Sequence, residues 1–493
     1  MTMLVYAIDV GTTNLKVVLY DERLAVLASA SGPVSYERSG DHVEFDAGAL
    51  FQTILALVAD CARRAAVTTR EHDAVLAFTG QAESLVLVDA SGRPVRPALS
   101  WLDSRAGVEA ELMAASFSAD TAFEISGQPF ASAAWPAAKL RWLRAHEPET
   151  MARTHEVLMV KDYLIRRFTG HSVGEVSTRG FTYLWDVRRS QYWGEMLEFC
   201  GLTSDQLPEV AAAGSDVGPV LADVVAQLPE AVGYQVNVGA LDHFCAMAGT
   251  GSYRAGTISE SAGTVLSLSM LASDWRFDPS QRISFHTGLH PDDIVLFNGA
   301  DSGGVVLEWF RREGLQNLSH AELERELTSR SAMGAPIFLP YLTGLNPPDY
   351  LPDARGAFVG ISLGHDRFDL AYAVEEGLAH LLKRNIDSFS GARAQQIVST
   401  GGGTASTFRN QLKADVCEVD VVVPNEREAT CRGAAVLALV AAGELASIHD
   451  AAELNRPLNA RYEPSRGRLR TELIDRAERY ALCEDSLHRL YAT

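Results

Sequence analysis

The chain has 493 residues, of which 47% are hydrophobic and 22% are charged, with a formal net charge of −20 and a pI near 5.1. This length exceeds what one hydrophobic core normally serves, so two or more domains are expected, with a functional site in a cleft between them. The negative charge argues against non-specific binding to nucleic acid or to an anionic membrane, since both repel an acidic protein.

The cysteines and the N-terminal segment bear on location. The six cysteines, at positions 61, 200, 245, 417, 431 and 483, form no CxxC pair and show no metal-ligand spacing with the thirteen histidines. They are therefore expected to be buried free thiols in a reducing compartment. No targeting segment precedes the first apolar run, and no apolar run approaches the ~20 residues of a membrane helix. These features predict a cytoplasmic protein without a membrane span.

The first predicted elements are two strands joined by a glycine-containing turn. Residues 4–8 and 17–20 are predicted to pair, and the octapeptide 9–16, Asp-Val-Gly-Thr-Thr-Asn-Leu-Lys, contains the turn between them. Such a turn offers backbone N–H groups and hydroxyls to an anion, because glycine leaves room for close approach. It therefore predicts a phosphate site, although an ordinary tight hairpin with a solvated aspartate accounts for the same octapeptide.

The rest of the first half alternates strands and helices. Asp46 is predicted to cap a helix that carries apolar residues at 50, 51, 54, 57, 58 and 61. Further strands are expected at residues 25–28, 74–78 and 85–88. Further helices are expected at 138–146, at 162–168 and before Gly201, a plausible C-terminal cap. This alternation indicates an α/β fold.

The second half repeats the opening pattern. A strand at 257–259, a turn at 261–264 (Ser-Ala-Gly-Thr) and a strand at 265–270 follow the same plan as the N-terminus, which indicates an internal repeat. Residues 368–389 predict an amphipathic helix that faces the core. A strand at 396–399 then runs into Thr-Gly-Gly-Gly at 400–403, which is expected to open a helix through Cys417. Bare backbone at a helix N-terminus favours phosphate, although a flexible connection is the alternative.

Asp242 is the candidate for activating an acceptor. It follows an apolar stretch and precedes the small-residue run 246–251. A carboxylate there is able to accept a proton from an alcohol during phosphoryl transfer, which asks little covalent chemistry of the protein. Taken alone, a helix cap is the simpler interpretation of this residue.

Taken together and in this order, these segments resemble the FGGY family of carbohydrate kinases, part of the wider sugar kinase, heat-shock-70 and actin superfamily. The resemblance covers nearly the whole chain. The octapeptide 9–16 is similar to the family's first phosphate motif, 261–264 to its second and 400–403 to its adenosine motif. Further matches are Lys-Leu-Arg-Trp-Leu at 139–143, Trp-Leu-Asp-Ser-Arg at 101–105, Lys-Asp-Tyr-Leu at 161–164, Phe-Leu-Pro-Tyr at 338–341, and 356–361 with 376–377.

The resemblance implies an α/β fold of two ribonuclease-H-like, actin-like ATPase domains flanking a deep catalytic cleft. Residues 1–248 would bind the sugar or polyol and residues 249–493 most of the ATP. Asp242 falls at the position of the catalytic base, and Asp9 with Asp242 at the positions that help to hold Mg²⁺. The implied nucleotide ligands are Gly11, Thr12, Thr13, Asn14, Lys16, Gly263 and Thr264 for the phosphates, Gly401, Gly402 and Gly403 for adenosine, and Gly303 as a further nucleotide-binding residue. Lys16 is equally well explained as a solvated hairpin lysine.

The acceptor is expected to be larger than glycerol. Glycerol kinases of the family show an Arg-Glu pair where this chain has Ala82 and Glu83, and their later tyrosine has no counterpart at 133–134, where two alanines stand. Xylulose kinases carry Met-His at the same pair. The space left by the arginine predicts a four- to six-carbon ketose or alditol, with a xylulose- or glycerol-type kinase as the alternative. The expected acceptor ligands are Gln81, Glu83, Trp101, Asp103 and His243, the last of which a core histidine explains equally well.

Other functional classes fit less well. A nucleotide-switched regulatory protein without transferase activity is the alternative from another class, and it would not need Asp242. A Rossmann dehydrogenase lacks a complete GxGxxG followed by an acidic residue, and no P-loop or histidine-rich metal cluster is present in the sequence. Glu375, Ala134 and Ala145 depart from the family signatures, which bears on subfamily more than on chemistry. A homodimer is suggested by the family resemblance alone.

Overall fold

The computed structural model describes residues 3–65, 69–278, 283–330, 334–346, 348–389, 393–452, 454 and 458–491. The chain forms two compact units. Unit 1 is Met1–Tyr253, Phe285–Val295 and Glu428–Arg456, and unit 2 is Arg254–Ser284, Leu296–Arg427 and Pro457–Thr493. The first exchange between units lies near the expected boundary at residue 248. The return of the segments that begin at Phe285 and Glu428 to unit 1 was not predicted.

Unit 1 is built on a six-stranded sheet of order β14-β15-β6-β1-β2-β3. The paired strands at the N-terminus are confirmed: β1 and β2 are antiparallel, as are β2 and β3. On the other side of β1, β6 and then β15 run parallel to it, and β14 is antiparallel to β15. The bounds are β1 Met3–Val10, β2 Asn14–Tyr20, β3 Val26–Pro33, β6 Asp73–Gly80, β14 Asp216–Pro219 and β15 Gly233–Leu241.

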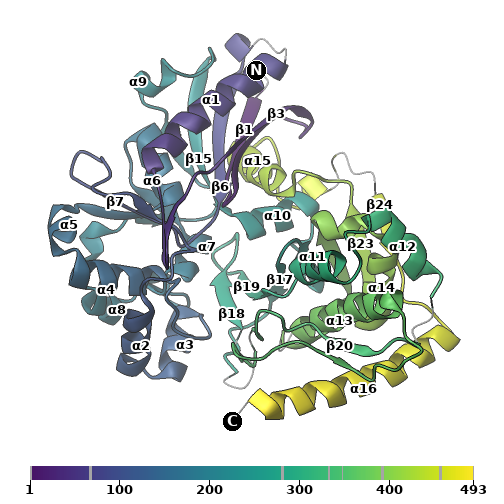
Figure 1. Ribbon diagram of the computed structural model, residues 1–493. Coiled ribbons are helices and arrows are strands. Elements are labelled where there is room, and N and C mark those ends of the chain that lie inside the picture. The colour runs from purple at the N-terminus through teal and green to yellow at the C-terminus, as the bar shows by residue number, and fades with distance from the viewer. Residues whose placement is uncertain are drawn as a thin grey trace. The chain divides into compact units, whose positions relative to one another are not determined.

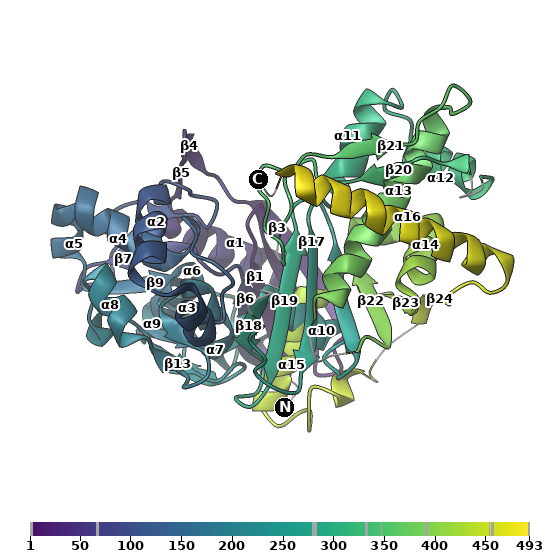
Figure 2. The same cartoon turned by 90° about the horizontal axis from the view of Figure 1, so that it is seen from below.

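Helices cover both faces of this sheet (Figures 1 and 2). The even-numbered residues of β1, from Leu4 to Val10, pack with α1 (Ala47–Ala65) and α6 (Val160–Thr169) in one core. Because side chains alternate along a strand, Asp9 belongs to the opposite face. That face meets α15 (Ala429–Ala441), which contacts β1, β6 and β15 and packs on α10 (Asp242–Thr250).

The remaining part of unit 1 carries a five-stranded sheet of order β4-β5-β8-β7-β9 and several short elements. The strands of this sheet are β4 Glu37–Ser39, β5 His42–Phe45, β7 Leu85–Val88, β8 Ala98–Leu99 and β9 Glu156–Met159. Two further pairs are formed by β10 Val173–Glu175 with β13 Glu209–Ala211 and by β11 Trp185–Asp186 with β12 Gln191–Tyr192. The helices of this part are α2 Gly107–Ser116, α3 Ala119–Ser126, α4 Pro136–His146, α5 Pro148–Arg153, α7 Val176–Arg179, α8 Gly194–Cys200 and α9 Ala222–Val225. The Asp46 carboxylate accepts from the N–H groups of Gly48 and Ala49, which confirms the predicted cap of α1.

Unit 2 repeats the same plan, as the internal repeat predicts. Its strands are neighbours in the order β19-β17-β16-β22-β23-β24, and the sheet's last strand, β18, falls almost wholly in the segment Phe285–Val295 that is assigned to unit 1. β16 and β17 form the antiparallel pair, β22 and β23 continue in parallel, and β24 is antiparallel to β23. The bounds are β16 Thr257–Ala262, β17 Leu266–Ala272, β18 Ser284–Thr287, β19 Ile294–Ala300, β22 Gln396–Thr400, β23 Asp420–Pro424 and β24 Leu458–Tyr462. The α/β class and the two related sheets are thereby confirmed.

The helices of unit 2 pack around α13 (Arg367–Asp387), the predicted amphipathic helix. It contacts α11 (Gly304–Glu313), α12 (His320–Thr328) and α14 (Thr407–Cys417), and the small pair β20 (Ile337–Leu339) and β21 (Ala357–Val359) lies beside it. The C-terminal α16 (Arg468–Tyr491) contacts β20 and α14. Both views show α16 running along these elements (Figures 1 and 2).

One local prediction was wrong. The glycines at 401–403 do not open α14 directly, because a short 3₁₀ turn, Gly402–Ala405, intervenes. The α-helix begins at Thr407, and the Ser406 hydroxyl caps it by accepting from the Arg409 N–H. Ser406 favours a helix start after this separate turn, since a serine hydroxyl is a good helix cap.

Candidate active site

Three of the expected site segments begin where neighbouring strands of the unit 1 sheet end, at the same register position. Val10 of β1 and Leu241 of β15 are both in register with Gly80 of β6. The next residues along each strand are Gly11, Gln81 and Asp242. Because the three strands are parallel, these segments meet at one carboxyl edge of the sheet, the usual place for a ligand in an α/β sheet. The topology thus gathers residues from positions 11, 81 and 242.

A bulge in β15 sets the direction of Asp242. The register with β6 shifts by one residue between Asn237 and Ala240. Gly239 occupies the bulge with φ of 59°, and a Cβ there would lie 1.6 Å from the Phe78 carbonyl oxygen. Asn237 holds the bulge, since its side chain accepts from the Gly239 N–H at 2.9 Å and donates to the Gly214 carbonyl at 2.6 Å. An extra residue turns the following side chains to the other face, so the bulge determines where Asp242 points.

Asp242 is the first residue of α10, and Leu241 occupies the cap position. The backbone just before it is anchored inside unit 1. The Leu241 N–H donates to the Ser177 hydroxyl at 2.9 Å, and that hydroxyl donates to Glu175 at 2.7 Å. Glu175 also accepts from the buried Lys161 ammonium at 2.9 Å. The Asp242 side chain itself stays 30% exposed.

Asp9 is a half-buried residue with one carboxylate oxygen available to a ligand. Within the described part of the chain, its Oδ1 is shielded from solvent and has no hydrogen-bond partner. Burial, the charge of Asp242 and that of Glu428 raise the pKa of Asp9 to about 7, against the influence of Lys16. The negative charges of Asp9 and Asp242 repel each other, so a proton or a cation at Asp9 is favoured.

Glu83 stands in a strained conformation. Its φ of 68° lies in the left-handed region that favours glycine, which costs ~1–3 kcal/mol for other residues and is typical of functional sites. Burial raises the pKa of the Glu83 carboxyl; the Lys139 ammonium opposes this shift, and Asp242 adds to it. Lys139 is fully buried and donates to the Ser100 carbonyl at 2.8 Å. Burial lowers the pKa of Lys139, and the charges of Glu83 and Asp103 oppose this shift.

Two of the expected acceptor ligands are engaged in the protein itself. Both oxygens of Asp103 accept from the Arg105 guanidinium, one of them also accepts from the Val43 N–H, and the residue is fully buried. This argues against the predicted contact of Asp103 with the acceptor. Gln81, 5% exposed, donates to the Gly11 carbonyl at 3.3 Å and accepts from Ser84 at 2.7 Å. Gln81 therefore supports the turn, and its side chain is largely occupied.

The other two expected acceptor ligands lie at the edge of the site. Trp101 is half-buried, and its indole N–H donates to the Thr12 hydroxyl at 2.9 Å. His243 is half-buried, with its Nε2 3.9 Å from Asp242 Oδ1, and its backbone N–H donates to the same carboxylate. Both side chains therefore lie beside residues expected to take part in the reaction.

The first glycine turn is open to solvent at its tip. Thr13 and Asn14 are exposed, and Gly11 and Thr12 are half-buried. A Cβ at Gly11 would lie 2.7 Å from the Asn14 carbonyl oxygen, which explains the glycine. Lys16, for which both a phosphate contact and a solvated position were expected, pairs its ammonium with Glu428 at 2.7 Å.

The second glycine turn lies in unit 2. Gly263 and Thr264 are exposed, and their carbonyls accept from the Gly304 and Val305 N–H groups at 3.0 Å each. Gly303 packs so tightly on this turn that a Cβ would lie 2.6 Å from the Val265 carbonyl carbon. The N-terminus of α11 is thus fastened to the turn.

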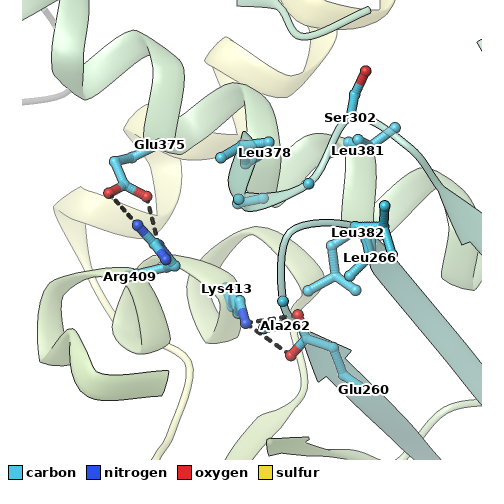
Figure 3. A pocket seen from close by; sticks show the side chains of 15 residues that line it. Glu260, Ala262, Leu266, Ser302, Glu375, Leu378, Leu381, Leu382, Arg409 and Lys413 are labelled. Carbon is cyan, nitrogen blue, oxygen red and sulfur yellow. Dashed lines mark hydrogen bonds and ion pairs between the residues drawn. The ribbon is translucent and has the colours of Figure 1, made fainter. Parts of the chain in front are cut away.

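Beside that turn is a pocket of about 460 Å³ (Figure 3). Its apolar lining comes from Leu266, Leu378, Leu381 and Leu382. Two ion pairs mark the other side: Arg409 binds Glu375 through two hydrogen bonds of 2.8 Å, and Lys413 binds Glu260 at 2.6 Å. An apolar pocket with few polar groups is typical of a site for a flat, partly apolar ligand.

The third glycine segment adjoins the second turn. Gly401 has a φ of 88°, and a Cβ there would lie 2.8 Å from the Ala262 carbonyl oxygen. A Cβ on Gly403 would contact both Ala262 and the Arg409 guanidinium at 3.1 Å. Gly402, in contrast, faces open space and is exposed. Bare backbone is therefore available to a ligand at this point.

Several contributing residues escaped sequence reasoning. Lys139 and Glu375 lie in or beside segments similar to the family signatures. The sequence spacing could not predict that Lys139 interacts with Glu83 or that Glu375 forms an ion pair with Arg409. Ser177 had no signal at all, since a buried serine resembles many others. Among the described residues, no group of three or more His, Cys, Asp or Glu could hold a metal ion, and no helix has the length and apolarity to cross a membrane.

Comparison with known proteins places these features in a family. The model of the FGGY family of carbohydrate kinases, N-terminal domain, matches residues 4–249, and that of the C-terminal domain matches residues 261–442. A xylulose kinase of Bacillus subtilis (strain 168) is 27% identical over 91% of this chain and 90% of its own. A glycerol kinase of Acidovorax ebreus is 29% identical over 95% and 96%, and a gluconokinase of B. subtilis is 24% identical over 91% and 89%.

Solved structures show the same fold. A ligand-bound xylulose kinase from Lactobacillus acidophilus superposes with a TM-score of 0.91 over 99% of both chains at 22% identity. A gluconate kinase from the same organism gives 0.92 over 100% of this chain and 99% of its own, also at 22% identity.

Proposed function

The chain belongs to the FGGY family of carbohydrate kinases, and we propose that it phosphorylates a hydroxyl of a neutral sugar or polyol of four to six carbons, a ketose or an alditol. ATP-dependent phosphorylation of a sugar or polyol is the activity of this family. The proposal adds the kind of acceptor, Mg²⁺, and Asp242 as the general base. The observation that carries it is the position of three carboxylates at one edge of the sheet: Asp9 lies near the end of β1, Glu83 three residues after β6, and Asp242 directly after β15, and these three strands are parallel neighbours.

Asp242 is suited to the role of base because its side chain is accessible to a substrate while its backbone is held in place. Its side chain is 30% exposed, while the preceding backbone is fixed through Ser177. In the proposed step, the acceptor hydroxyl oxygen bonds to the γ-phosphorus, the bond to the ADP oxygen breaks, and the hydroxyl proton passes to Asp242. Beyond this proton transfer, the protein has to position the two reactants and stabilise the charge that develops on the phosphoryl group.

A magnesium site fits the carboxylates of unit 1. Asp9 offers a buried oxygen that no described residue binds, and burial, together with the charge of Asp242, raises its pKa. Mg²⁺ commonly uses one or two carboxylates together with phosphate oxygens and water, so a three-residue cluster is not required. We assign Asp9 and Asp242 as the residues that would hold it. When bound, the ion would offset negative charge on the phosphoryl group.

The nucleotide ligands are proposed on three turns. Gly11, Thr12, Thr13 and Asn14 in unit 1 and Gly263 with Thr264 in unit 2 present exposed backbone or hydroxyls suited to phosphate. Gly303 acts by allowing close packing at the second turn. Gly403 lies close to the Arg409 guanidinium, and the ion pair of Arg409 with Glu375 lines the apolar pocket. The glycine segment 401–403 therefore adjoins the pocket, which supports adenosine binding there. Lys16 is retained as a weaker candidate because it is already paired.

A neutral acceptor follows from the charges around Glu83. Asp9, Glu83 and Asp242 are acidic, and the nearby cation Lys139 is buried and bonded to the Ser100 carbonyl. An aldonate would bring another negative charge toward these carboxylates, whereas hydroxyls can donate hydrogen bonds to them. Ala82 in place of an arginine leaves room for a longer chain. A xylulose-type kinase agrees with this picture better than a glycerol-type kinase does.

The test is acceptor-dependent ADP release with Mg-ATP over a panel of glycerol, erythritol, ribitol, D-xylulose, D-fructose and D-gluconate. We expect kcat/KM to rise from glycerol to the four- to six-carbon neutral compounds and to stay low for D-gluconate. The phosphate position on the product is read by NMR. A preference for glycerol or for gluconate would reject the proposed acceptor class, although not the kinase activity.

The Asp242→Asn variant distinguishes a kinase from a nucleotide switch. Loss of a general base typically costs ~10²–10⁴ in rate, so we expect kcat to fall by at least about 100-fold with the KM for ATP little changed. Undiminished turnover would favour the regulatory alternative. The six free cysteines, five of them buried, are compatible with the proposed cytoplasmic location, and a homodimer is part of the same proposal.

A further inference from the structure

A set of hydrogen bonds joins residues 81–84 and Trp101, which include expected acceptor ligands, to the first glycine turn at Gly11 and Thr12. Gln81 donates to the Gly11 carbonyl at 3.3 Å, and Ser84 donates to Gln81 at 2.7 Å. The Trp101 backbone N–H donates to Ser84 at 3.0 Å, and its indole N–H donates to the Thr12 hydroxyl at 2.9 Å. Three separate segments of unit 1 are thereby connected.

The last of these bonds constrains the Thr12 hydroxyl. A tryptophan indole can only donate, so Thr12 Oγ1 must be the acceptor in this pair. A threonine hydroxyl carries a single proton, which is then left to be donated elsewhere. A hydroxyl that accepts one hydrogen bond becomes a better donor in the next. Trp101 therefore prepares Thr12 to donate to an anion at the turn.

The backbone of the same turn is held independently. The Tyr36 hydroxyl donates to the Thr12 carbonyl at 2.8 Å, and the Val34 N–H donates to the Thr13 carbonyl at 2.9 Å. Removal of the indole N–H should therefore weaken the Thr12 hydroxyl as a hydrogen-bond donor, while the turn keeps its position. This separation allows the role of Trp101 to be tested without loss of the fold.

We propose that Trp101 is a positioning residue that couples acceptor binding to the phosphate-binding hydroxyl of Thr12. The inference rests on the proposed function. The half-buried Trp101 is an expected acceptor ligand, and its indole N–H reaches the first glycine turn, so an acceptor that contacts the ring would also order Thr12. Acceptor and nucleotide should then strengthen each other's binding, as coupled sites must do reciprocally.

The experiment is a double-mutant cycle with Trp101→Phe, which keeps an aromatic ring, and Thr12→Val, which keeps the side-chain shape. The acceptor is the one with the highest kcat/KM in the panel above. We expect each single variant to lower kcat by about tenfold, the usual scale for one bond to a charged group. The double variant should fall less than about twofold further, because both changes remove the same interaction.

A binding measurement separates coupling from simple packing. The Kd of a non-hydrolysable ATP analogue is measured with and without that acceptor. In the wild type the acceptor should tighten analogue binding several-fold, and in Trp101→Phe this gain should be lost. A purely packing role would raise the KM for the acceptor and leave the gain intact. Tyr36→Phe is the matched control, since it removes a bond to the Thr12 backbone and should preserve the gain.

The outcomes separate the inference from the proposed function. Wild-type protein without acceptor-dependent ADP release on any panel compound would reject the proposed function. Active wild-type protein with additive losses in the double variant, or with coupling that survives Trp101→Phe, would overturn this inference alone. Thermal unfolding of each variant near the wild-type temperature establishes that the losses arise in the folded state.

Discussion

The Lys16 ammonium lies 2.7 Å from the Glu428 carboxylate, although 412 positions separate the two residues. Lys16 is on β2, next to the first glycine turn, and Glu428 immediately precedes α15. Because α15 packs on β1, β6 and β15, this late segment of the chain supplies the partner of an early one. A residue expected to serve the phosphates is thus already neutralised.

This pairing predicts a small effect for Lys16→Met. The two side chains are 36% and 25% exposed, and such ion pairs contribute ~0–1 kcal/mol. We expect the free energy of unfolding to change by less than about 1 kcal/mol and the KM for ATP to rise by less than about threefold. Glu428→Gln is measured alongside. A tenfold rise in KM for Lys16→Met would mean that the ammonium leaves Glu428 for the phosphates.

The raised pKa of Asp9 predicts a pH-dependent gain for Asp9→Asn. Its folded pKa of about 7 exceeds the usual unfolded value of ~3.9, so the folded state disfavours the charged form. The resulting penalty is absent below the unfolded pKa and complete above pH 7. In the presence of a chelator, Asp9→Asn should therefore unfold at a higher temperature than wild type at about pH 8, and this difference should shrink toward about pH 5.

Asp89 provides a control of opposite sign. Hydrogen bonds from Ser91 lower the pKa of its carboxyl, so this group stabilises the fold above its usual pKa and loses the contribution in acid. Asp89→Asn should accordingly lower the unfolding temperature near neutral pH, with a difference that fades as the pH falls. Parallel pH profiles for the two variants would contradict the account of Asp9.

Ser177→Ala tests the anchor of the proposed base. The change deprives the buried Leu241 N–H of its acceptor and Glu175 of a donor, which should cost ~1–3 kcal/mol. Because Asp242 follows Leu241, we also expect a drop in kcat without a change in acceptor KM. Ser126→Ala is a matched control, since Ser126 is also buried, donates to the Ala122 carbonyl and accepts from the Gln128 N–H. Equal kcat losses in both variants would point to general destabilisation.

The bulge before Asp242 should not tolerate a side chain. Gly239→Ala places a Cβ 1.6 Å from the Phe78 carbonyl oxygen at a φ of 59°. We expect a loss of more than about 3 kcal/mol, or failure to fold, because backbone must move. Gly443→Ala has a φ of 77° and no neighbour within 4 Å, so it should show the conformational cost of ~1–2 kcal/mol alone. Equal costs at the two glycines would contradict the packing argument.

Glu375 departs from the family signature, and Arg409 explains why it is tolerated. Glu375→Leu would leave the guanidinium buried without its partner, at a cost of ~3–5 kcal/mol. The double variant Glu375→Leu with Arg409→Met should recover most of this loss in thermal unfolding. If Arg409 also supports the glycine turn at Gly403, the double variant should keep a raised KM for ATP. A double variant less stable than the single would refute the pairing account.

Local pattern was enough to identify the elements around each glycine turn. The apolar runs beside 9–16 and 261–264 predicted the antiparallel pairs β1–β2 and β16–β17, because strand pairing across a short turn depends on neighbouring residues. The Asp46 cap and α13 were predicted for the same reason. Asp9 and Asp242 were selected through the family resemblance of their segments, and their roles stay predictions.

Only the tertiary structure decided which side chains are free to act. Asp103 is bound by Arg105 and Val43, Lys16 is paired with Glu428, and Glu83 lies near the buried Lys139. Sequence alone determined the two repeated α/β halves and their glycine turns, since short-range periodicity and turn chemistry specify them. It could not determine these partnerships, because contacts across tens to hundreds of positions depend on how strands and helices pack and leave no local pattern.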